Sequence, residues 1–390
     1  MLKTKGNSAA IVGVYEHPAR KTPDKTVAQL HLECALGALA DAALSLCDVD
    51  GYFCAGDVPG MGAIHMAEYL GIRPSYIDNT ELGGASYLTL VAHACQAIEA
   101  GKCNVALITL AGRPRSDAAL GMGPPSLGAN IPEDPYEVPF GLNTVASYAM
   151  LAARHMYEFG TTSEQLAWIK VAASHHAQHN PQAMRRELVS VDDVLGSPII
   201  ASPLHRLDCC VVSDGGGAIV VARRDLAPST AKSGVALRGS GAAIKGHDKG
   251  ALDLSYTAAA WSSRAAFDEA GLQPADIKYA SIYDSFTITL LMLIEDIGFC
   301  PKGEGGRYVA DGKLIAGVGP LAVNTDGGGL CNNHPANRGG ITKIIEAVRQ
   351  LRGEAHPQVQ VPDCEFALVQ GMGGRLAGRH GCATLILERC

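Results

Sequence analysis

Short runs of hydrophobic residues recur along the chain, and longer stretches with helical spacing lie between them. The runs show little alternation between hydrophobic and polar positions, which is typical of strands that are buried on both faces. They occupy residues 9–15, 105–112, 218–223, 279–286, 366–374 and 383–388. Because helical stretches separate these runs, the pattern predicts a layered α/β fold.

Two of the helical stretches share one hydrophobic spacing. Each follows a glycine-rich loop, stops at a glycine and leads toward a strand. Both place hydrophobic residues at offsets 0, 3, 4, 7 and 10, which is one face of a helix. The positions are Leu88, Val91, Ala92, Cys95 and Ile98 in the first stretch, and Ile341, Ile344, Ile345, Val348 and Leu351 in the second.

Two further pairs of segments repeat in the same order. They are residues 30–56 with 259–286, and residues 213–224 with 378–389. Three matched segments predict a duplicated α/β body. The simpler interpretation, that any α/β chain repeats helix–strand units, stays open at this point. We place the two halves at residues 1–225 and 226–390.

Residues 113–200 have no counterpart in the second half. The stretch begins with a loop rich in proline and glycine, and two helical segments follow. Thr162 and Gln165 have the spacing of a capping box at the start of one helix. We interpret the stretch as an excursion from the first half that covers the active-site face.

Composition and charge limit the partners of the chain. Among 390 residues, 39 Asp and Glu outnumber 32 Lys and Arg, and the net charge of −7 argues against a nucleic-acid binder. No hydrophobic run is long enough to span a membrane and no leader pattern is visible, so we expect a cytoplasmic protein. The 12 cysteines form no CxxC pair, and His175 and His179 lack the glutamate of an HExxH motif, so we expect no bound metal.

Two long segments resemble a known family. Residues 140–224, which begin FGLNTVASYAMLAARHMYEFG, and residues 323–340, VNTDGGGLCNNHPANRGG, are similar to the thiolase superfamily. The closest branch is that of sterol-carrier and lipid-transfer-protein thiolases, and the resemblance covers essentially the whole chain. It implies a five-layered αβαβα sandwich from two duplicated halves, which is usually dimeric and acts on acyl-CoA thioesters.

The chain departs from the catalytic pattern of that superfamily. Thiolases acylate a cysteine at the N-terminus of a helix, where amide dipoles lower the pKa of the thiol. That position falls on or near Gly84, in the segment GGAS, and no cysteine is present. Cys95 lies about three turns further along the helix. A serine nucleophile needs a general base, so we predict that Ser86 caps the helix instead.

The other catalytic groups of thiolases are also changed. The loop that carries a second cysteine in the family reads GMGG at residues 371–374. The family's HDxF-type motif reads YDSF at residues 283–286, and only His334 stands where a family histidine is expected. A site stripped in this way resembles the lipid-transfer-protein-type aldolases of bacterial steroid side-chain degradation, which are also similar in the segment 298–313.

This second resemblance implies a function and a partner. It implies retro-aldol cleavage of a β-hydroxyacyl-CoA, such as a steroid side chain, with the CoA thioester as substrate, no acyl-enzyme and no tightly bound cofactor. It further implies a small partner that contains a zinc ribbon and an OB-fold and binds the acyl-CoA, beside a homodimer. Two other functions stay open. One is an acyltransferase that uses Cys331 or Ser86 as an unusual nucleophile, and the other is a non-catalytic scaffold that binds lipid or CoA.

Retro-aldol cleavage needs a group that moves the proton of the β-hydroxyl and donors that hold an enolate oxygen. Tyr283 is the candidate acid/base, and Asp284 is expected to orient the neighbouring loop. His334, with Asn332 or Asn333 beside it, is the candidate donor to the enolate. Related aldolases are expected to carry a second tyrosine near the HP motif, so either its role has moved to His334 or the substrate differs.

The remaining candidates lie in glycine-rich segments. The segments 83–86 and 371–374 are expected to form the substrate and oxyanion loops, through Gly84, Ser86, Gly371, Met372 and Gly373. The segment 241–250 carries Lys245 and Lys249. These two lysines either contact the phosphates of CoA or belong to a solvated loop.

Overall fold

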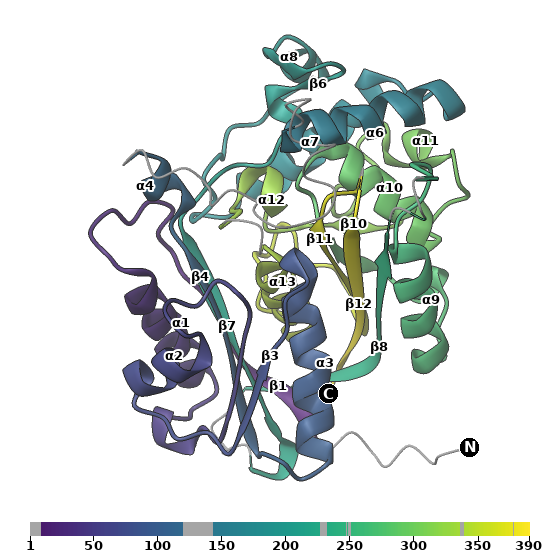
Figure 1. Cartoon of the computed structure of the whole chain (residues 1–390). Helices are drawn as coiled ribbons and strands as arrows, with labels where there is room; N and C mark the ends of the chain where they lie inside the picture. Colours follow the sequence, from purple (N-terminus) through teal and green to yellow (C-terminus); the bar gives the residue numbers. More distant parts are fainter. Residues whose placement is uncertain are drawn as a thin grey trace.

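The central element of the protein is a sheet of ten strands (Figure 1). The computed structural model describes residues 9–119, 143–226, 232–246, 248, 251–335, 339–376 and 378–390. The strands of the N-terminal half are β1 (Ala9–Glu16), β2 (Gly51–Cys54), β3 (Tyr76–Asn79), β4 (Val105–Gly112) and β7 (Gly215–Arg223). Those of the C-terminal half are β8 (Val235–Lys245), β9 (Tyr279–Ile282), β10 (Ala322–Val323), β11 (Phe366–Gly374) and β12 (His380–Arg389).

The strand order repeats on either side of the contact between β1 and β8. Outward from that contact the order is β1-β7-β4-β2-β3 on one side and β8-β12-β11-β9-β10 on the other. The pairing repeats as well, because the first three strands of each half are antiparallel and the outer pairs are parallel. One residue pair, Ile11 with Val235, joins the halves. The predicted duplication is therefore confirmed, while the boundary between residues 225 and 226 stays a prediction.

Helices form three layers around the two halves of the sheet. The principal ones are α1 (Val27–Asp41), α2 (Ala63–Leu70), α3 (Ser86–Glu99), α9 (Ala259–Ala270), α10 (Thr287–Ile297) and α13 (Gly340–Arg352). The helices α3 and α13 contact strands of both halves and lie between them (Figure 1). The pair α1 and α2 covers one outer face and the pair α9 and α10 the other. This arrangement is the expected five-layered αβαβα sandwich.

The hydrophobic faces predicted for the two central helices meet in one core. The positions at Leu88, Val91 and Ile98 of α3 and at Ile341 and Ile345 of α13 are all buried in the same cluster. Both ends of the sheet contribute strands to this cluster, so the two halves share a single interior. Burial of a leucine or isoleucine side chain stabilises the fold by about 1.5–3 kcal/mol, which is why these faces fix the layers.

Most of the described part of the excursion lies over the C-terminal half, whereas α4 (Pro114–Ala119) lies against the N-terminal half, where the N–H of Ser116 donates to Asp214 at 3.0 Å. The part over the C-terminal half comprises α6 (Thr144–Phe159), α7 (Ser163–Ala177), α8 (Val191–Leu195) and the start of β5 (Ile199–Ala201), and β6 (Leu204–His205) follows it. The capping box of Thr162 and Gln165 is confirmed at the start of α7. The helix α7 packs on α10, on α11 (Gly305–Val309) and on α12 (Gly328–Cys331), which directly precedes the candidate catalytic turn. In the described ranges, every helix is too short or too polar to cross a bilayer.

Candidate active site

Tyr283 and His334 meet where the central helices begin. Tyr283 follows the last residue of β9, and its N–H donates to the carbonyl of Gln370 at 3.0 Å. His334 lies in the turn after α12. The Tyr283 hydroxyl and His334 Nε2 are 3.0 Å apart, and the two rings meet edge to face at 74°. The structure thus brings together the two residues that the sequence singled out.

The imidazole of His334 is neutral at physiological pH. Burial lowers its pKa to about 4, and the nearby carboxylate of Asp284 offsets only part of this effect. The backbone N–H of His334 donates to the Ser213 hydroxyl at 3.0 Å, which fixes the turn. A neutral imidazole within hydrogen-bond distance of a phenol is able to accept the phenol proton.

Asp284 holds the loop that leads to His334, as predicted. Its carboxylate accepts from the backbone N–H of Gly329 at 2.8 Å and of Leu330 at 3.3 Å. The ammonium of Lys343, on α13, donates to the same carboxylate at 2.6 Å, and both side chains are buried. Lys343 was not among the residues predicted from the sequence, although a lysine within the strongly hydrophobic run ITKIIEAV was an available signal.

The N-termini of both central helices lie beside this pair. The 3₁₀ turn Gly83–Ala85 leads into α3, and α13 starts after Gly339. A Cβ atom on Gly84 would lie 2.8 Å from Cζ of Tyr283, and one on Gly339 would lie 3.5 Å from Cδ2 of His334. Helix N-termini present free N–H groups and a partial positive charge, so both favour negative charge that develops here.

The close packing around Gly84 explains why this position carries no side chain. A Cβ atom there would overlap the ring of Tyr283 and the carbonyl oxygen of Met372. The tyrosine ring therefore fills the space that a cysteine at this position would need. The prediction that Ser86 caps α3 was wrong, because Ala85 is the N-cap residue. Ser86 is buried, and its hydroxyl accepts from the N–H of Leu82 at 2.7 Å.

Two further predictions about the oxyanion donors are corrected by the geometry. Residues 371–374 are not a loop but the end of β11, where Gly371 pairs with Ala383 and Gly374 with His380. These residues, Gly371, Met372 and Gly373 among them, lie in a ladder that already uses part of their backbone groups. The Met372 side chain points into the core, and its sulfur accepts from the Tyr148 hydroxyl at 3.8 Å.

Asn332 and Asn333 point away from the tyrosine. The amide nitrogen of Asn332 donates to Glu16 at 3.1 Å and to Asp326 at 2.9 Å. The amide nitrogen of Asn333 also donates to Glu16. Both donors are therefore engaged in a buried ionic cluster, and we remove the two asparagines from the set of groups that contact substrate. Glu16 was not predicted from the sequence, because it lies more than 300 residues away along the chain.

Cys331 is not an activated nucleophile. Its side chain is buried, and burial raises the pKa of the thiol even though Lys170 stands beside it. The Lys170 ammonium donates to Cys331 Sγ at 3.1 Å and to the carbonyl of Leu330 at 2.6 Å. A thiol that stays protonated at neutral pH is a poor nucleophile, because the thiolate is the reactive form.

The lysines proposed for CoA do not support that role. Lys245 is buried, its ammonium donates to the carbonyls of Asp253 and Tyr256, and it lies 3.5 Å from the centre of the Tyr256 ring. Two hydrogen bonds and the contact with the ring hold the ammonium within the fold, so the prediction was wrong for Lys245. Lys249 lies outside the described residues.

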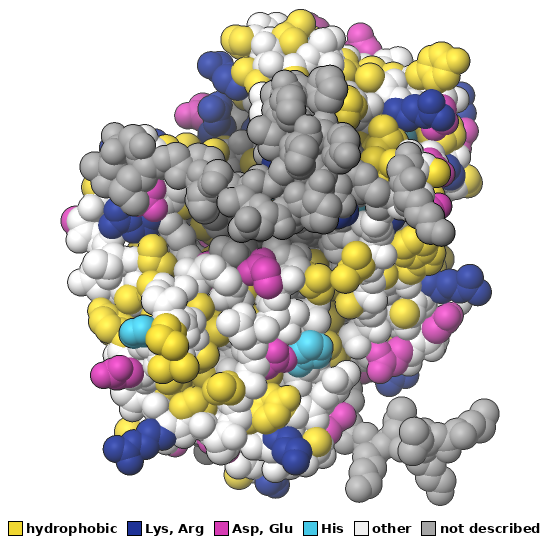
Figure 2. All heavy atoms as spheres, viewed as in Figure 1, with side chains coloured by type: hydrophobic (Ala, Val, Ile, Leu, Met, Phe, Trp, Pro, Cys, Tyr) yellow, Lys and Arg dark blue, Asp and Glu magenta, His cyan; other side chains and the backbone are white. Residues whose placement is uncertain are grey.

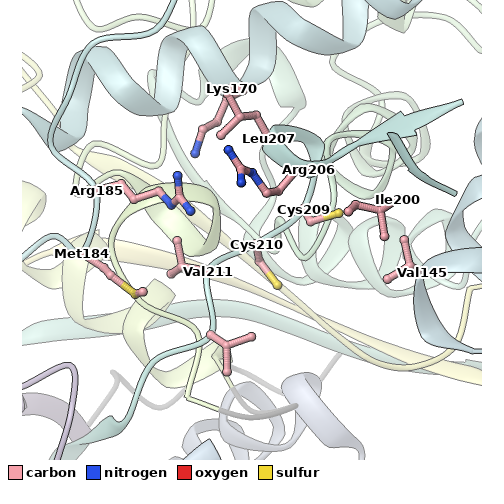
Figure 3. A pocket seen from close by; sticks show the side chains of 11 residues that line it. Val145, Lys170, Met184, Arg185, Ile200, Arg206, Leu207, Cys209, Cys210 and Val211 are labelled. Atoms are coloured by element: carbon pink, nitrogen blue, oxygen red, sulfur yellow. The ribbon is translucent and has the colours of Figure 1, made fainter. Parts of the chain in front are cut away.

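A cavity of about 250 Å³ is lined by the segment 209–212, which also contacts the candidate active site (Figure 3). Three cationic side chains, those of Lys170, Arg185 and Arg206, point into it from different elements. The wall of the cavity is continuous with the site, because Cys210 donates to the carbonyl of Ser285 and Val211 to that of Gly329, both at 2.9 Å. No periodic pattern in the sequence marks these arginines, because Arg185 lies in an irregular segment and Arg206 begins the short 3₁₀ helix Arg206–Asp208.

Comparisons with known proteins agree with this architecture. Residues 241–389 match the family model described as "Thiolase C-terminal domain-like". The chain is 34% identical to a "Steroid side-chain-cleaving aldolase" of Thermomonospora curvata, over 89% of this chain and 90% of that one. It is 31% identical to an "Acetyl-CoA acetyltransferase" of Methanothermobacter thermautotrophicus, over 94% of this chain and 96% of that one.

A solved structure described as "Ltp2-ChsH2(DUF35) aldolase" is similar over the whole length. It is 31% identical, covers 98% of each chain and superposes with a TM-score of 0.86. The chain therefore belongs to the thiolase superfamily. Within it, the chain belongs to the branch of lipid-transfer-protein-type aldolases.

Proposed function

We propose that the protein is a carbon–carbon lyase that cleaves a β-hydroxyacyl-CoA by retro-aldol chemistry. One observation carries the proposal. Tyr283 fills the space beside Gly84 that a nucleophilic side chain would need, and its hydroxyl lies 3.0 Å from a neutral His334. The site therefore offers a proton-transfer pair in place of an acyl acceptor. The two aldolases to which the chain is similar support the same chemistry.

The reaction follows from this pair. The β-hydroxyl of the substrate gives its proton to Tyr283, while the phenol proton of Tyr283 passes to Nε2 of His334. The Cα–Cβ bond then breaks, the β-carbon becomes a carbonyl, and the bonding electrons move onto the thioester as an enolate. Return of the proton to Cα gives the shortened acyl-CoA. A positioned acid/base pair of this kind contributes roughly 10²–10⁴-fold to the rate.

The enolate is stabilised by the ends of the central helices. Both N-termini flank the Tyr283–His334 pair, and α3 and α13 are each long enough to carry a full helix dipole. Fixed donors in a site without water are each worth about 3–4 kcal/mol to a developing oxyanion. Helix N–H groups replace the asparagine amides in this role.

The cationic cavity is the proposed place for the phosphate-bearing arm of CoA. Arg185 and Arg206 are exposed, and guanidinium groups bind phosphate through paired N–H groups. Because the cavity wall runs on to Ser285 and Gly329, an extended arm that starts here leads toward the tyrosine.

Removal of one cavity arginine tests this assignment. Arg206→Ala is expected to raise KM for the acyl-CoA about tenfold with kcat nearly unchanged, since a lost charged hydrogen bond costs on the order of 1.5 kcal/mol. Arg186→Ala is the matched control, because Arg186 is exposed next to Arg185 and donates to the carbonyl of Gln178. An equal rise in KM for both variants would contradict a specific role of the cavity.

Two partners belong to the proposal. The similar solved aldolase is described with a DUF35 partner, and we propose a small acyl-CoA-binding protein with a zinc ribbon and an OB-fold in that role here.

We also propose a homodimer through β3, the edge strand of the N-terminal half. Ile77 on β3 and Ile64 and Tyr69 on α2 are exposed, and Figure 2 shows hydrophobic side chains over this region. An edge strand with exposed hydrophobic residues favours pairing with a second copy.

Product analysis tests the proposed function directly. The chain and its DUF35-type partner, incubated with a β-hydroxyacyl-CoA, should release equal amounts of a ketone or aldehyde and a shortened acyl-CoA. Transfer of an acyl group to free CoA without a carbonyl product would instead indicate an acyltransferase, the activity named for the archaeal relative. Binding without turnover would indicate a scaffold.

A further inference from the structure

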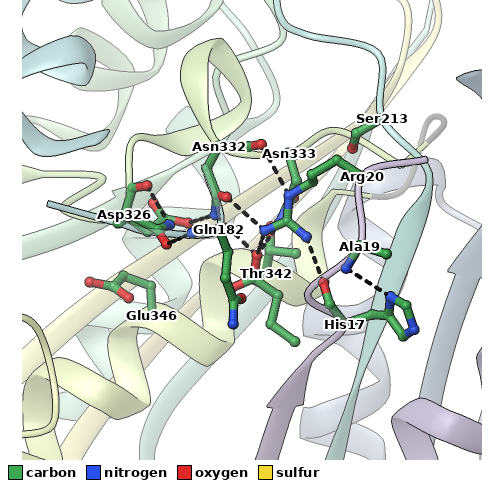
Figure 4. Close-up of polar contacts among 12 residues, drawn as sticks. His17, Ala19, Arg20, Gln182, Ser213, Asp326, Asn332, Asn333, Thr342 and Glu346 are labelled. Carbon is green, nitrogen blue, oxygen red and sulfur yellow. Dashed lines mark hydrogen bonds and ion pairs between the residues drawn. The ribbon is translucent and has the colours of Figure 1, made fainter. Parts of the chain in front are cut away.

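A buried ionic cluster lies behind the turn that carries His334. Its centre is Glu16, the last residue of β1, whose side chain is 1% exposed. Arg20 approaches from the loop after β1 and Arg349 from α13. Figure 4 shows Arg20, Asn332 and Asn333 close together within this cluster.

One carboxylate gathers four donor groups. Oε1 of Glu16 accepts from Arg20 at 2.5 Å, from Asn332 at 3.1 Å and from Asn333, while Oε2 accepts from Arg349 at 3.0 Å. Arg20 also donates to the side-chain oxygen of Asn332 at 2.8 Å and to its backbone carbonyl at 3.3 Å. These bonds hold both asparagines by their side chains, from the N-terminal half of the molecule.

The two asparagines are the residues immediately before His334. Their amide groups face Glu16, whereas the His334 imidazole faces Tyr283. The backbone of His334 itself is held by Ser213, whose hydroxyl accepts from the His334 N–H. The orientation of the imidazole is thus set by the backbone between two anchors, one at Glu16 and one at Ser213.

Glu16 is charged in the folded protein. Burial alone would raise the pKa of its carboxyl group, but the guanidinium groups of Arg20 and Arg349 and the amide of Asn332 hold the pKa below its ordinary value. Hydrogen bonds to an ionised acceptor are shorter and about twice as strong as neutral ones. A glutamine has the same shape but no charge, so its hydrogen bonds to the two arginines and two asparagines would be weaker. Its amide NH₂ would also face groups that are themselves donors.

We propose that Glu16 is a positioning residue that sets the distance between His334 and Tyr283 through Asn332 and Asn333. This inference rests on the proposed function and adds a residue that touches neither the substrate nor the catalytic pair. A displacement of about 1 Å in a catalytic group is enough to cost on the order of 10²-fold in rate.

The test compares two carboxylates that bind α13 to the N-terminal half. Glu16→Gln is expected to lower kcat about 10- to 100-fold with KM nearly unchanged. Asp41→Asn is the matched control, because Asp41 accepts from Arg352 on the same helix at 2.8 Å. Among the described residues its other partners are Val14 and Lys232, which lie outside the 332–334 turn. Equal losses of kcat in both variants, after correction for the folded fraction, would overturn the inference.

Asn333→Ala separates positioning from folding. It removes one of the two links between Glu16 and the turn and keeps the ion pairs of Glu16 intact, so it remains informative if Glu16→Gln does not fold. It should lower kcat in the same direction, and the double variant should lose no more than the stronger single variant. Additive effects on kcat would show that Glu16 does not act through Asn333.

An NMR measurement keeps the inference independent of the reaction. In histidine-labelled protein, the ring signals of His334 should shift in Glu16→Gln and in Asn333→Ala but not in Asp41→Asn. An unmoved His334 signal would overturn the positioning role. Absence of cleavage by the wild-type protein would instead overturn the proposed function and leave this readout interpretable.

Discussion

Tyr283→Phe is expected to lower kcat by about 10³-fold, because the phenol is the proposed proton acceptor and acid/base groups contribute roughly 10²–10⁴-fold to the rate. The substitution removes one oxygen atom and leaves the ring beside Gly84 in place. Substrate binding should therefore persist, and KM should change little. The effect is measured as release of the carbonyl product under saturating substrate.

A matched control distinguishes loss of catalysis from loss of structure. Tyr52, on β2, is fully buried in the core between the sheet and the helices α1 and α2, and its hydroxyl bonds to that of Thr109 at 2.9 Å. Tyr52→Phe should destabilise the fold by about 1 kcal/mol, the usual contribution of one hydrogen bond, and leave kcat unchanged. Full activity of Tyr283→Phe would remove this residue from the mechanism.

Gly84→Ala is expected to cost both stability and activity. The added methyl group overlaps the Met372 carbonyl and the Tyr283 ring. One of these groups or the backbone at the start of α3 must therefore shift. Overpacking of this kind costs about 1–3 kcal/mol, which thermal or denaturant unfolding would show. Because the ring of Tyr283 must move, kcat should also fall by about 10²-fold.

Gly246→Ala is the control for this prediction. A Cβ atom at Gly246 meets nothing within 4 Å, so alanine there should leave stability and activity close to the wild type. If Gly84→Ala behaved like Gly246→Ala, the space beside Tyr283 would be larger than the structure shows. Gly84→Cys would then be the variant able to restore a nucleophile.

The sequence predicted the layers because burial follows local periodicity. The spacing of Leu88, Val91 and Ile98 recurs in α13, and both faces are buried as one core. Tyr283 and His334 were also accessible from sequence, since each belongs to a short motif that resembles a family site. Local pattern and local motif therefore predicted the scaffold and the reacting pair.

Side-chain direction was not predictable from the sequence. Asn332 and Asn333 adjoin His334 along the chain, yet their amides follow the charge of Glu16, a residue brought near only by the fold. Lys245 looked like a surface cation in a glycine-rich loop, yet two backbone carbonyls and an aromatic ring bury it. Electrostatic partners decide such orientations, and long-range partners leave no periodic trace in sequence.

The cavity arginines were missed for a related reason. Arg185 lies in an irregular segment before β5, Arg206 begins a short 3₁₀ helix directly after β6, and Lys170 comes from α7. Each looks like an ordinary surface or helix cation when considered alone. The three cations line one cavity, and the segment 209–213 connects that cavity to the active site through its hydrogen bonds to Ser285 and Gly329. This connection is visible only in the folded structure.

Mass spectrometry of the intact enzyme during turnover tests the central claim most directly. The reaction with a β-hydroxyacyl-CoA, quenched in acid within the first turnovers, should yield protein of unmodified mass alongside the carbonyl product. An acyl-sized increase in mass on any of the 12 cysteines or on Ser86, formed as fast as product appears, would contradict a mechanism that runs by proton transfer alone.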